Sequence, residues 1–280
     1  RQMCIRDRII INVLVFFGTL VAQRYGIDLA NYLGLHFFLA SDFNPAQLIT
    51  YMFMHAGLLH ILFNMLWLYW FGSLFLHFFS AKHLRGLYIL GGILGGLLYM
   101  VAYNVFPLFN QEVAVSTLVG ASASVLAIVA ATAYREPNYR VQLFLFGAIR
   151  LKYLALVVIG IDVLSITSSN AGGHIAHLGG ALAGLWFAAS LSKGTDLTSW
   201  INWILDGFTS LFQKKTWKRK PKMKVHYGNS ATGREKDYDY NAHKKAQSDE
   251  VDRILEKLKK SGYDSLTTEE KKSLFDASKR

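Results

Sequence analysis

The most informative stretch of the chain is Val119-Gly-Ala-Ser-Ala-Ser-Val-Leu-Ala-Ile-Val-Ala-Ala131. It is apolar and built from small residues, and it opens with the turn Gly120-Ala-Ser122 before continuing as a potential membrane helix. Small residues let membrane helices pack closely, so a serine in such a helix means little alone. Its meaning depends on two other apolar segments, one with His60 and Asn64 and one with His177.

Composition indicates a helical membrane protein. The chain has 280 residues, 52% of them hydrophobic, and several uncharged runs approach twenty residues. Such runs can cross a hydrocarbon layer about 30 Å thick. We expect an all-α, polytopic bundle of six transmembrane helices, with spans at about 9–22, 58–79, 84–105, 118–133, 150–168 and 174–192.

The N-terminal end is interpreted separately. Residues 1–8 are treated as an uncertain N-terminal segment and are left out of the fold prediction, and residues 9–22 are interpreted as a first span because no small-residue cleavage site precedes Gln23. The single cysteine, Cys4, excludes a disulfide within the chain.

The distribution of Lys and Arg predicts the orientation in the membrane. Basic residues occur in residues 1–8, near 82–85, across 135–152 and in the C-terminal part, whereas the opposite side has only Arg24. By the positive-inside rule, both termini face the cytoplasm and Ser122 lies near the outer half of the bilayer. We expect an integral, multi-pass protein of a bacterial cytoplasmic membrane.

The C-terminal part has a different character, because residues 193–280 carry 20 of the 30 basic residues. A basic segment directly after a membrane span favours anionic lipids over nucleic acid as its partner. We expect an interfacial amphipathic helix at 193–213, a basic and polar linker at 214–248 and a cytoplasmic helical hairpin at 249–280. The second helix of the hairpin should begin at the capping box Thr267-Thr-Glu-Glu270, and the hairpin could bind a cytoplasmic partner.

Polar residues of three spans form a candidate catalytic set. His60 and Asn64 are four residues apart and share one helix face. His177 precedes a GxxxG face at 180–184, which lets its helix approach a neighbour closely. If that neighbour is the span of Ser122, the imidazole meets the hydroxyl and can take its proton. Unpaired backbone N–H groups at the helix start could stabilise an oxyanion, so the set predicts a serine-protease site within a membrane.

Structural alternatives remain for these residues. His60 and Asn64 could join helices by hydrogen bonds. Ser116 and Ser124 are rival serines, although Ser124 lies about 200° around the helix from Ser122.

Asp162 is the only carboxylate well inside an apolar run. It could orient His177 as the third member of a triad, or it could hold helices together, and the second role is the more common one. His55 could fix the loop before its helix.

Three motifs in chain order resemble the rhomboid intramembrane serine proteases of bacterial type. His55-Ala-Gly-Leu-Leu-His60-Ile-Leu-Phe-Asn64 is similar to the family's HxxxxHxxxN segment, and Gly120-Ala-Ser122-Ala is similar to its GxS turn. Ala176-His177-Leu-Gly-Gly180-Ala-Leu-Ala-Gly184 is similar to its AH motif with GxxxG. The resemblance covers about residues 9–192, and the tail around Gly262 resembles an extension of some bacterial members.

The resemblance implies a catalytic dyad that needs no acid, with Ser122 as the nucleophile and His177 as the general base. The oxyanion would be held by His60, Asn64 and the backbone N–H of Ser122. The residues that would shape the site are Gly120, His55, Gly180 and Gly184. It implies no metal and no cofactor, and its substrates would be membrane proteins cleaved in or near their transmembrane segments.

Two positions depart from the family's pattern. Ala123 replaces the second glycine of the commonest GxSG turn. Leu126 stands where well-studied members carry an aromatic ring that stacks on the histidine, so His177 must be held in another way. The Trp-Arg pair that many members show in the first loop is not evident.

Other functions fit parts of the pattern. A non-proteolytic rhomboid-like protein that binds client transmembrane helices would be expected to lack Ser122 or His177, and both are present. A metalloprotease using the histidines at 55, 60, 174 and 177 lacks an HExxH motif and a carboxylate near those histidines. A transporter would line a path with polar residues instead of gathering them.

Overall fold

The computed structural model describes residues 2–106, 109, 116–143, 147–168, 170–212 and 231–278. Its contacts divide the chain into two units, Arg1–Lys214 and Lys215–Arg280, and each is described by itself. The first unit holds every residue of the predicted site. The basic cluster at 214–224 and the first half of the predicted linker lie outside the described residues.

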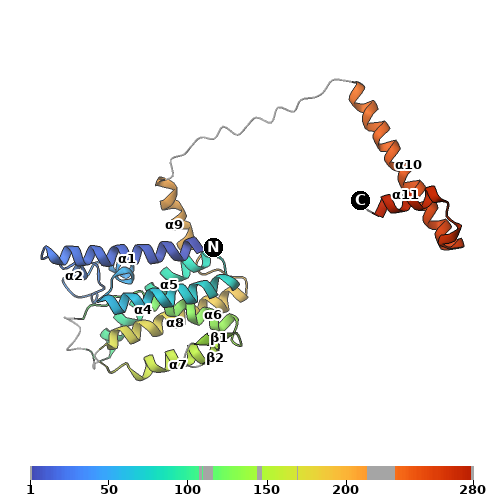
Figure 1. Cartoon of the computed structure of the whole chain (residues 1–280). Coiled ribbons are helices and arrows are strands. Elements are labelled where there is room, and N and C mark those ends of the chain that lie inside the picture. The colour runs from blue at the N-terminus through green and yellow to red at the C-terminus, as the bar shows by residue number, and fades with distance from the viewer. Residues whose placement is uncertain are drawn as a thin grey trace. The chain divides into compact units, whose positions relative to one another are not determined.

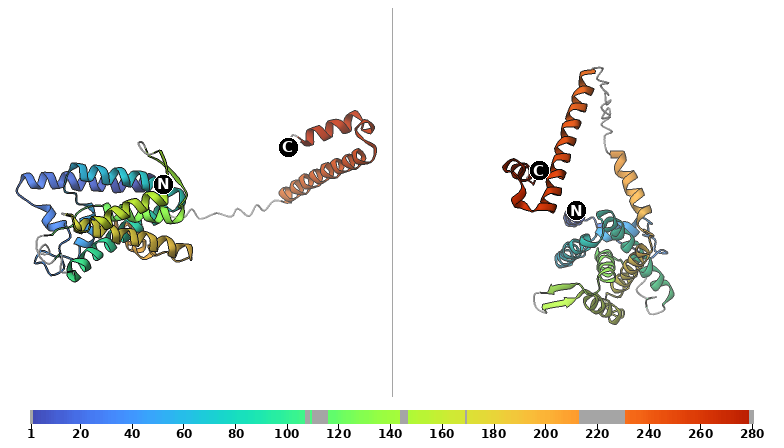
Figure 2. Two further views of the ribbon diagram at one scale, coloured as in Figure 1. Left: turned by 90° about the horizontal axis from the view of Figure 1, so that it is seen from below. Right: turned by 90° about the vertical axis from the view of Figure 1, so that its right-hand side faces the viewer.

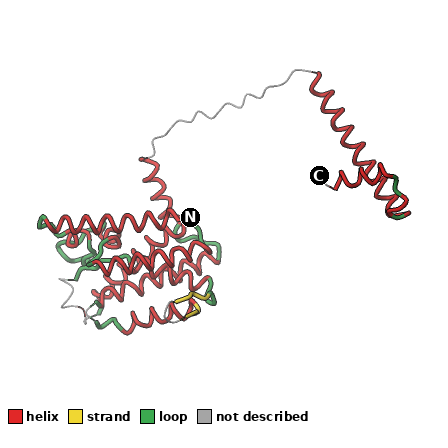
Figure 3. Tube along the Cα trace, viewed as in Figure 1, coloured by secondary structure: helices red, strands yellow, loops and turns green. Residues whose placement is uncertain are grey.

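The first unit is a bundle of helices with one small hairpin (Figures 1 and 3). In chain order its elements are α1 (Gln2–Arg24), α2 (Leu29–Leu33), α3 (Gln47–Thr50), η1 (Tyr51–Phe53), α4 (Leu58–Phe78), α5 (Ala81–Val105), α6 (Ser122–Arg135), β1 (Arg140–Leu143), β2 (Gly147–Arg150), α7 (Leu151–Leu164), α8 (Ala171–Ser192) and α9 (Ser199–Phe212). The helical bundle predicted from the sequence is confirmed. The antiparallel hairpin of β1 and β2, between α6 and α7, was not predicted.

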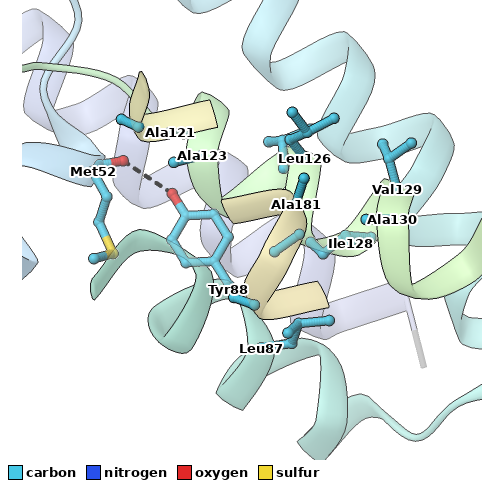
Figure 4. Close-up of a cluster of buried hydrophobic side chains, with 14 of the residues drawn as sticks. Met52, Leu87, Tyr88, Ala121, Ala123, Leu126, Ile128, Val129, Ala130 and Ala181 are labelled. Carbon is cyan, nitrogen blue, oxygen red and sulfur yellow. Dashed lines mark hydrogen bonds between the residues drawn. The ribbon is translucent and has the colours of Figure 1, made fainter. Parts of the chain in front are cut away.

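Helix α6 is the central helix of this unit and packs against α4, α5 and α8 (Figure 2). Every residue from Ala123 to Ala133 is buried. A helix that is apolar on all sides is stable only when it is surrounded, and its many alanines let the neighbouring helices approach. Figure 4 shows part of this core, where the Tyr88 hydroxyl of α5 donates to the Met52 carbonyl at 3.1 Å.

Glycines bring the neighbouring helices close to α6. A Cβ atom added at Gly180 or Gly184 of α8 would collide with the carbonyl oxygens of Ala123 and Ala127. A Cβ at Gly91 of α5 would collide with the Ala127 methyl group. The GxxxG face of α8 therefore packs on the helix that begins with the candidate nucleophile.

The predicted spans correspond to helices of different lengths. Within the described residues, α4, α5 and α8 are long and apolar enough to cross a membrane, and α6 is a shorter apolar helix. The first predicted span lies within α1, and α7 lies within the fifth. Residues 2–8, left uncertain by the sequence, are helical, since α1 starts at Gln2. Ile5 is buried against Gly72 of α4, which holds this first part of α1 on the bundle.

The segment before α6 is extended, so the helix begins at Ser122, a few residues after the predicted start of the span at about residue 118. Leu118 pairs with Leu35 through two backbone hydrogen bonds of 2.9 Å. The Gly120 N–H donates to the Tyr51 carbonyl at 3.0 Å. These bonds use the backbone groups that a longer helix would need, and they fix the start of α6.

Helix α9 lies within the segment predicted to be an interfacial helix and packs on α5. Arg85 of α5 donates to the Asp206 carboxylate at 2.7 Å and to the Asn202 side chain at 2.9 Å. The placement of α9 at a membrane interface stays a prediction.

The second unit contains α10 (Ala231–Ser261), η3 (Tyr263–Ser265) and α11 (Thr268–Ser278). The linker prediction was wrong for residues 231–248, which are helical; their Ala, Lys and Glu residues extend the amphipathic helix backwards. The predicted capping box is formed: the Thr267 N–H donates to the Glu270 carboxylate at 2.8 Å, and the Glu270 N–H donates to the Thr267 hydroxyl at 3.3 Å. Lys257 of α10 also donates to Glu270 at 2.8 Å, which ties the two helices together.

Candidate active site

A cavity of about 990 Å³ opens among the helices of the first unit. Its walls include His60 and Asn64 from α4, Ser122 from α6 and His177 from α8. These residues are up to 117 positions apart in the chain. The fold thus brings the four polar residues that the sequence singled out to one cavity.

Ser122 is half-buried and occupies the first position of α6. The backbone N–H of a residue in the first helical turn has no partner within the helix. Gly120 has a φ of +135°, a backbone conformation that residues with a side chain rarely adopt. The turn at Gly120 therefore positions both the hydroxyl and the free amide of Ser122.

His60 lies directly against this turn. A Cβ atom at Gly120 would be 3.0 Å from Nε2 and Cε1 of His60 and 3.5 Å from the Ser122 Oγ. The Ala56 N–H donates to Nδ1 of His60 at 3.3 Å, so in the neutral ring the proton is on Nε2, beside the turn. Asn64 donates one amide hydrogen to the His60 carbonyl at 2.9 Å and keeps a second one. N–H donors near the serine are what a developing oxyanion needs.

His177 is held by Asp162 of α7. Its Nδ1 lies 2.8 Å from Oδ1 of Asp162, and Nδ1 of His174 lies 2.8 Å from the same oxygen. Asp162 is buried, with 4% of its surface exposed. The two imidazole rings meet edge to face, with centroids 5.9 Å apart.

The expectation from the sequence that no carboxylate lies near the histidines was wrong. Asp162 is 12 and 15 residues before His174 and His177, on another helix, so only the packing of α7 on α8 brings them together. The role of His174 was missed altogether. The available signal was the position of Asp162 inside an apolar run, because such an acid requires a polar partner.

The histidines do not form a single metal-binding group in the described structure. His55 and His60 pack together with ring centroids 5.1 Å apart, and His174 and His177 share Asp162. Asp162, His174 and His177 have ligand atoms within 4.8 Å of one another, so these three side chains could hold a metal ion.

The rival serines have other contacts. Ser124 is fully buried, and its Oγ lies 3.9 Å from the Met52 sulfur. Ser116 also lines the cavity, but its hydroxyl accepts a hydrogen bond of 2.9 Å from Tyr99. Neither serine stands at the start of a helix beside the turn at Gly120, as Ser122 does.

His55 is buried beside the site, and neither of its ring nitrogens has a hydrogen-bond partner in the described structure. Burial, and then the nearby His60, lower the pKa of His55 from 6.5 to about 4. The ring is therefore neutral at pH 7 and packs edge-on against His60. This contact supports the His60 ring, which faces Gly120.

Two of the three departures from the family's pattern lie near the site and have different consequences. The Ala123 methyl group faces Gly95 of α5, and Ala123 does not line the cavity. Leu126 does line the cavity and offers His177 no aromatic surface. No hydrogen bond joins Ser122 to His177 within the described residues; catalytic hydrogen bonds are often long before substrate binds.

Comparisons with known proteins identify the families and relatives that the chain resembles. A family model described as "Rhomboid domain" matches residues 43–194, and one described as "Family of unknown function (DUF6576)" matches residues 234–280. The chain is 30% identical over 156 residues to "RHOMBOID-like protein 12, mitochondrial" of Arabidopsis thaliana, which covers 52% of this chain and 46% of that protein. It is 29% identical over 154 residues to "Presenilin-associated rhomboid-like protein A, mitochondrial" of Danio rerio, covering 51% and 38%. The matches thus span less than half the length of either relative.

Proposed function

Because the chain belongs to the rhomboid family, we propose that it is an intramembrane serine endopeptidase that hydrolyses peptide bonds in or near the transmembrane segments of other membrane proteins. The observation that carries this proposal is the convergence of Ser122, His177, His60 and Asn64 on one cavity. Two relatives carry names that place them in mitochondria. A bacterial membrane and cytoplasmic termini remain our proposals for this chain.

The chemistry follows from the roles of the four side chains. Nε2 of His177 removes the proton of the Ser122 hydroxyl as Oγ bonds to the substrate carbonyl carbon. The negative charge that forms on the carbonyl oxygen is stabilised by N–H groups of Ser122, His60 and Asn64. His177 then gives its proton to the leaving amine, and a water molecule hydrolyses the acyl-enzyme by the same steps in reverse.

The location of the site restricts its substrates. A peptide carbonyl in a stable membrane helix is bonded within the helix and is hidden from a nucleophile. We therefore propose that the substrates have small or helix-destabilising residues near the cleaved bond. The site opening toward the outer half of the bilayer would give the hydrolytic water access.

Labelling with a fluorophosphonate tests whether the serine is activated. The reagent should modify Ser122 in the folded protein, and mass spectrometry should locate the adduct on the peptide that contains it. Ser124→Ala should label like the wild type, whereas His177→Ala and Ser122→Ala should not label. An adduct on Ser116 or Ser124, or labelling that persists without His177, would contradict the assigned dyad.

A further inference from the structure

The contact between Asp162 and His177 is more than a link between two helices. Asp162 lies in the last turn of α7, and its Oδ1 accepts from Nδ1 of His177 at 2.8 Å. To donate this bond, the neutral imidazole must carry its proton on Nδ1. The other ring nitrogen, Nε2, is then unprotonated, which is the form that a general base for Ser122 requires.

The second oxygen of Asp162 indicates a further role for the carboxylate, which is to stabilise His177 when the ring is protonated. Oδ2 is buried and has no hydrogen-bond partner in the described structure. A carboxylate with one unpaired oxygen is poorly stabilised while both neighbouring rings are neutral. Its interaction strengthens when His177 takes the serine proton and becomes a cation, so the charge is matched to the reaction step.

His174 restricts the ring of His177 from a different direction. It donates to the same Oδ1 at 2.8 Å, and its ring meets His177 edge to face. Among the described residues, His174 supplies the aromatic ring that contacts His177, since residue 126 is a leucine. Asp162 and His174 together therefore fix both the position and the tautomer of the base.

We propose, on the basis of the function proposed above, that Asp162 is a positioning residue for His177. The site would then use a Ser–His–Asp set, in which the acid orients the base, and not a Ser–His dyad alone. His174 assists by its hydrogen bond to the shared carboxylate oxygen and its contact with the His177 ring, which hold these two groups in place. Asp162 does not touch the substrate, so its removal should slow catalysis and leave substrate binding unchanged.

The kinetic test uses the full chain in liposomes with a single-span substrate, in EDTA so that no metal ion held by the three side chains contributes. The variants are Asp162→Ala, which removes the acceptor, and Asp162→Asn, which can still accept a hydrogen bond but has lost the charge. Asp206→Asn on α9 is the matched control and should behave like the wild type. Turnover is expressed per site titrated to completion with fluorophosphonate, so that misfolded protein is not counted and the slower labelling of a folded site is not mistaken for its loss.

We expect Asp162→Ala to lower kcat by roughly 10²-fold to 10⁴-fold with KM unchanged, and Asp162→Asn to lower it at least as much, because its amide N–H can donate to Nδ1 of His177 and favour the unproductive tautomer. A purely structural tie between helices would reduce the number of active sites and leave kcat per site unchanged. A kcat per site for both variants close to that of the wild type would overturn the proposal.

The tautomer is measured independently of turnover, by ¹⁵N NMR of histidine-labelled protein at pH 8.5 with His177 identified from the spectrum of His177→Gln. The wild type should show the proton on Nδ1 of His177, and Asp162→Ala should lose this preference. If the wild type neither cleaves nor labels but shows this pattern, the proposed function fails and the positioning role stands. A His177 tautomer that does not depend on Asp162 would overturn the positioning role even if the enzyme is active.

Discussion

At the scale of single residues, Gly120 links the two sides of the site. Its positive φ shapes the turn before Ser122, and its missing side chain leaves room for the His60 ring. Adding a methyl group there would strain the backbone and push the His60 ring away from the proposed oxyanion position.

Gly120→Ala is therefore expected to lower kcat by about 10²-fold to 10³-fold, the usual effect of losing one oxyanion donor. Cleavage of a single-span substrate in liposomes measures it. Gly57→Ala is the matched control: Gly57 also lies near His60 in the chain, but a Cβ there would meet no atom within 4 Å. Equal activities of the two variants would contradict the role given to Gly120.

The buried His55 should make the stability of the folded protein depend on pH. The pKa of His55 is lowered from 6.5 to about 4 in the folded protein, so the unfolded state binds the proton more tightly and acid pH favours unfolding. The folded state should lose stability progressively as the pH falls from 6.5 to 4, by up to about 3 kcal/mol. The thermal midpoint in detergent should drop between pH 8 and pH 5, and it should drop less in His55→Phe, whose ring cannot be protonated. An identical drop in both proteins would exclude His55 as the cause.

The site residues differ in how well the sequence predicts them. Ser122, His60, Asn64 and His177 lie in short patterns of defined spacing, so they could be identified without a structure. The contact of Asp162 with His177 depends on the packing of α7 against α8, which no local pattern encodes. An acid inside an apolar run shows that a polar partner exists, but not which residue it is.

At the scale of secondary-structure elements, the glycines of α8 set its distance from α6. Gly184→Ala places a methyl group against the Ala127 carbonyl and should cost about 1–3 kcal/mol of stability, as overpacking usually does. Gly160→Ala in α7 is the control, because a Cβ there meets nothing within 4 Å and alanine favours a helix by up to about 1 kcal/mol. Unfolding by SDS in mixed micelles should separate the two variants in opposite directions. A stable Gly184→Ala protein would contradict the close approach of α8 to α6.

Element boundaries were harder to predict than elements. Apolar runs located the spans, since burial and the membrane both require them. The start of α6 could be placed only to within a few residues, because the pairing of Leu118 with Leu35 is a contact between distant segments. The beginnings of α1 and α10 were misplaced because charged and polar residues at 2–8 and 231–248 obscured helices that start earlier.

At the scale of the whole molecule, we expect the two units to have separate roles. All site residues lie in Arg1–Lys214, and the tail has its own helical hairpin, which matches a separate family model. We expect a chain that ends at Lys214 to cleave a model substrate at the rate of the full chain in neutral vesicles. The tail should instead strengthen association with anionic lipid or with a cytoplasmic protein.

Comparing the full and shortened chains in vesicles with and without anionic lipid checks this division. Loss of cleavage on shortening would show that the tail belongs to the active unit. Unchanged membrane placement and unchanged partners would remove the proposed role of the tail.

The most direct test of the proposed serine protease is cleavage of a single-span substrate in liposomes by wild type, Ser122→Ala and Ser124→Ala, each with and without a chelator. We expect wild type and Ser124→Ala to cleave, Ser122→Ala not to cleave, and the chelator not to abolish cleavage. Cleavage that survives Ser122→Ala, or that the chelator abolishes in the wild type, would contradict this expectation.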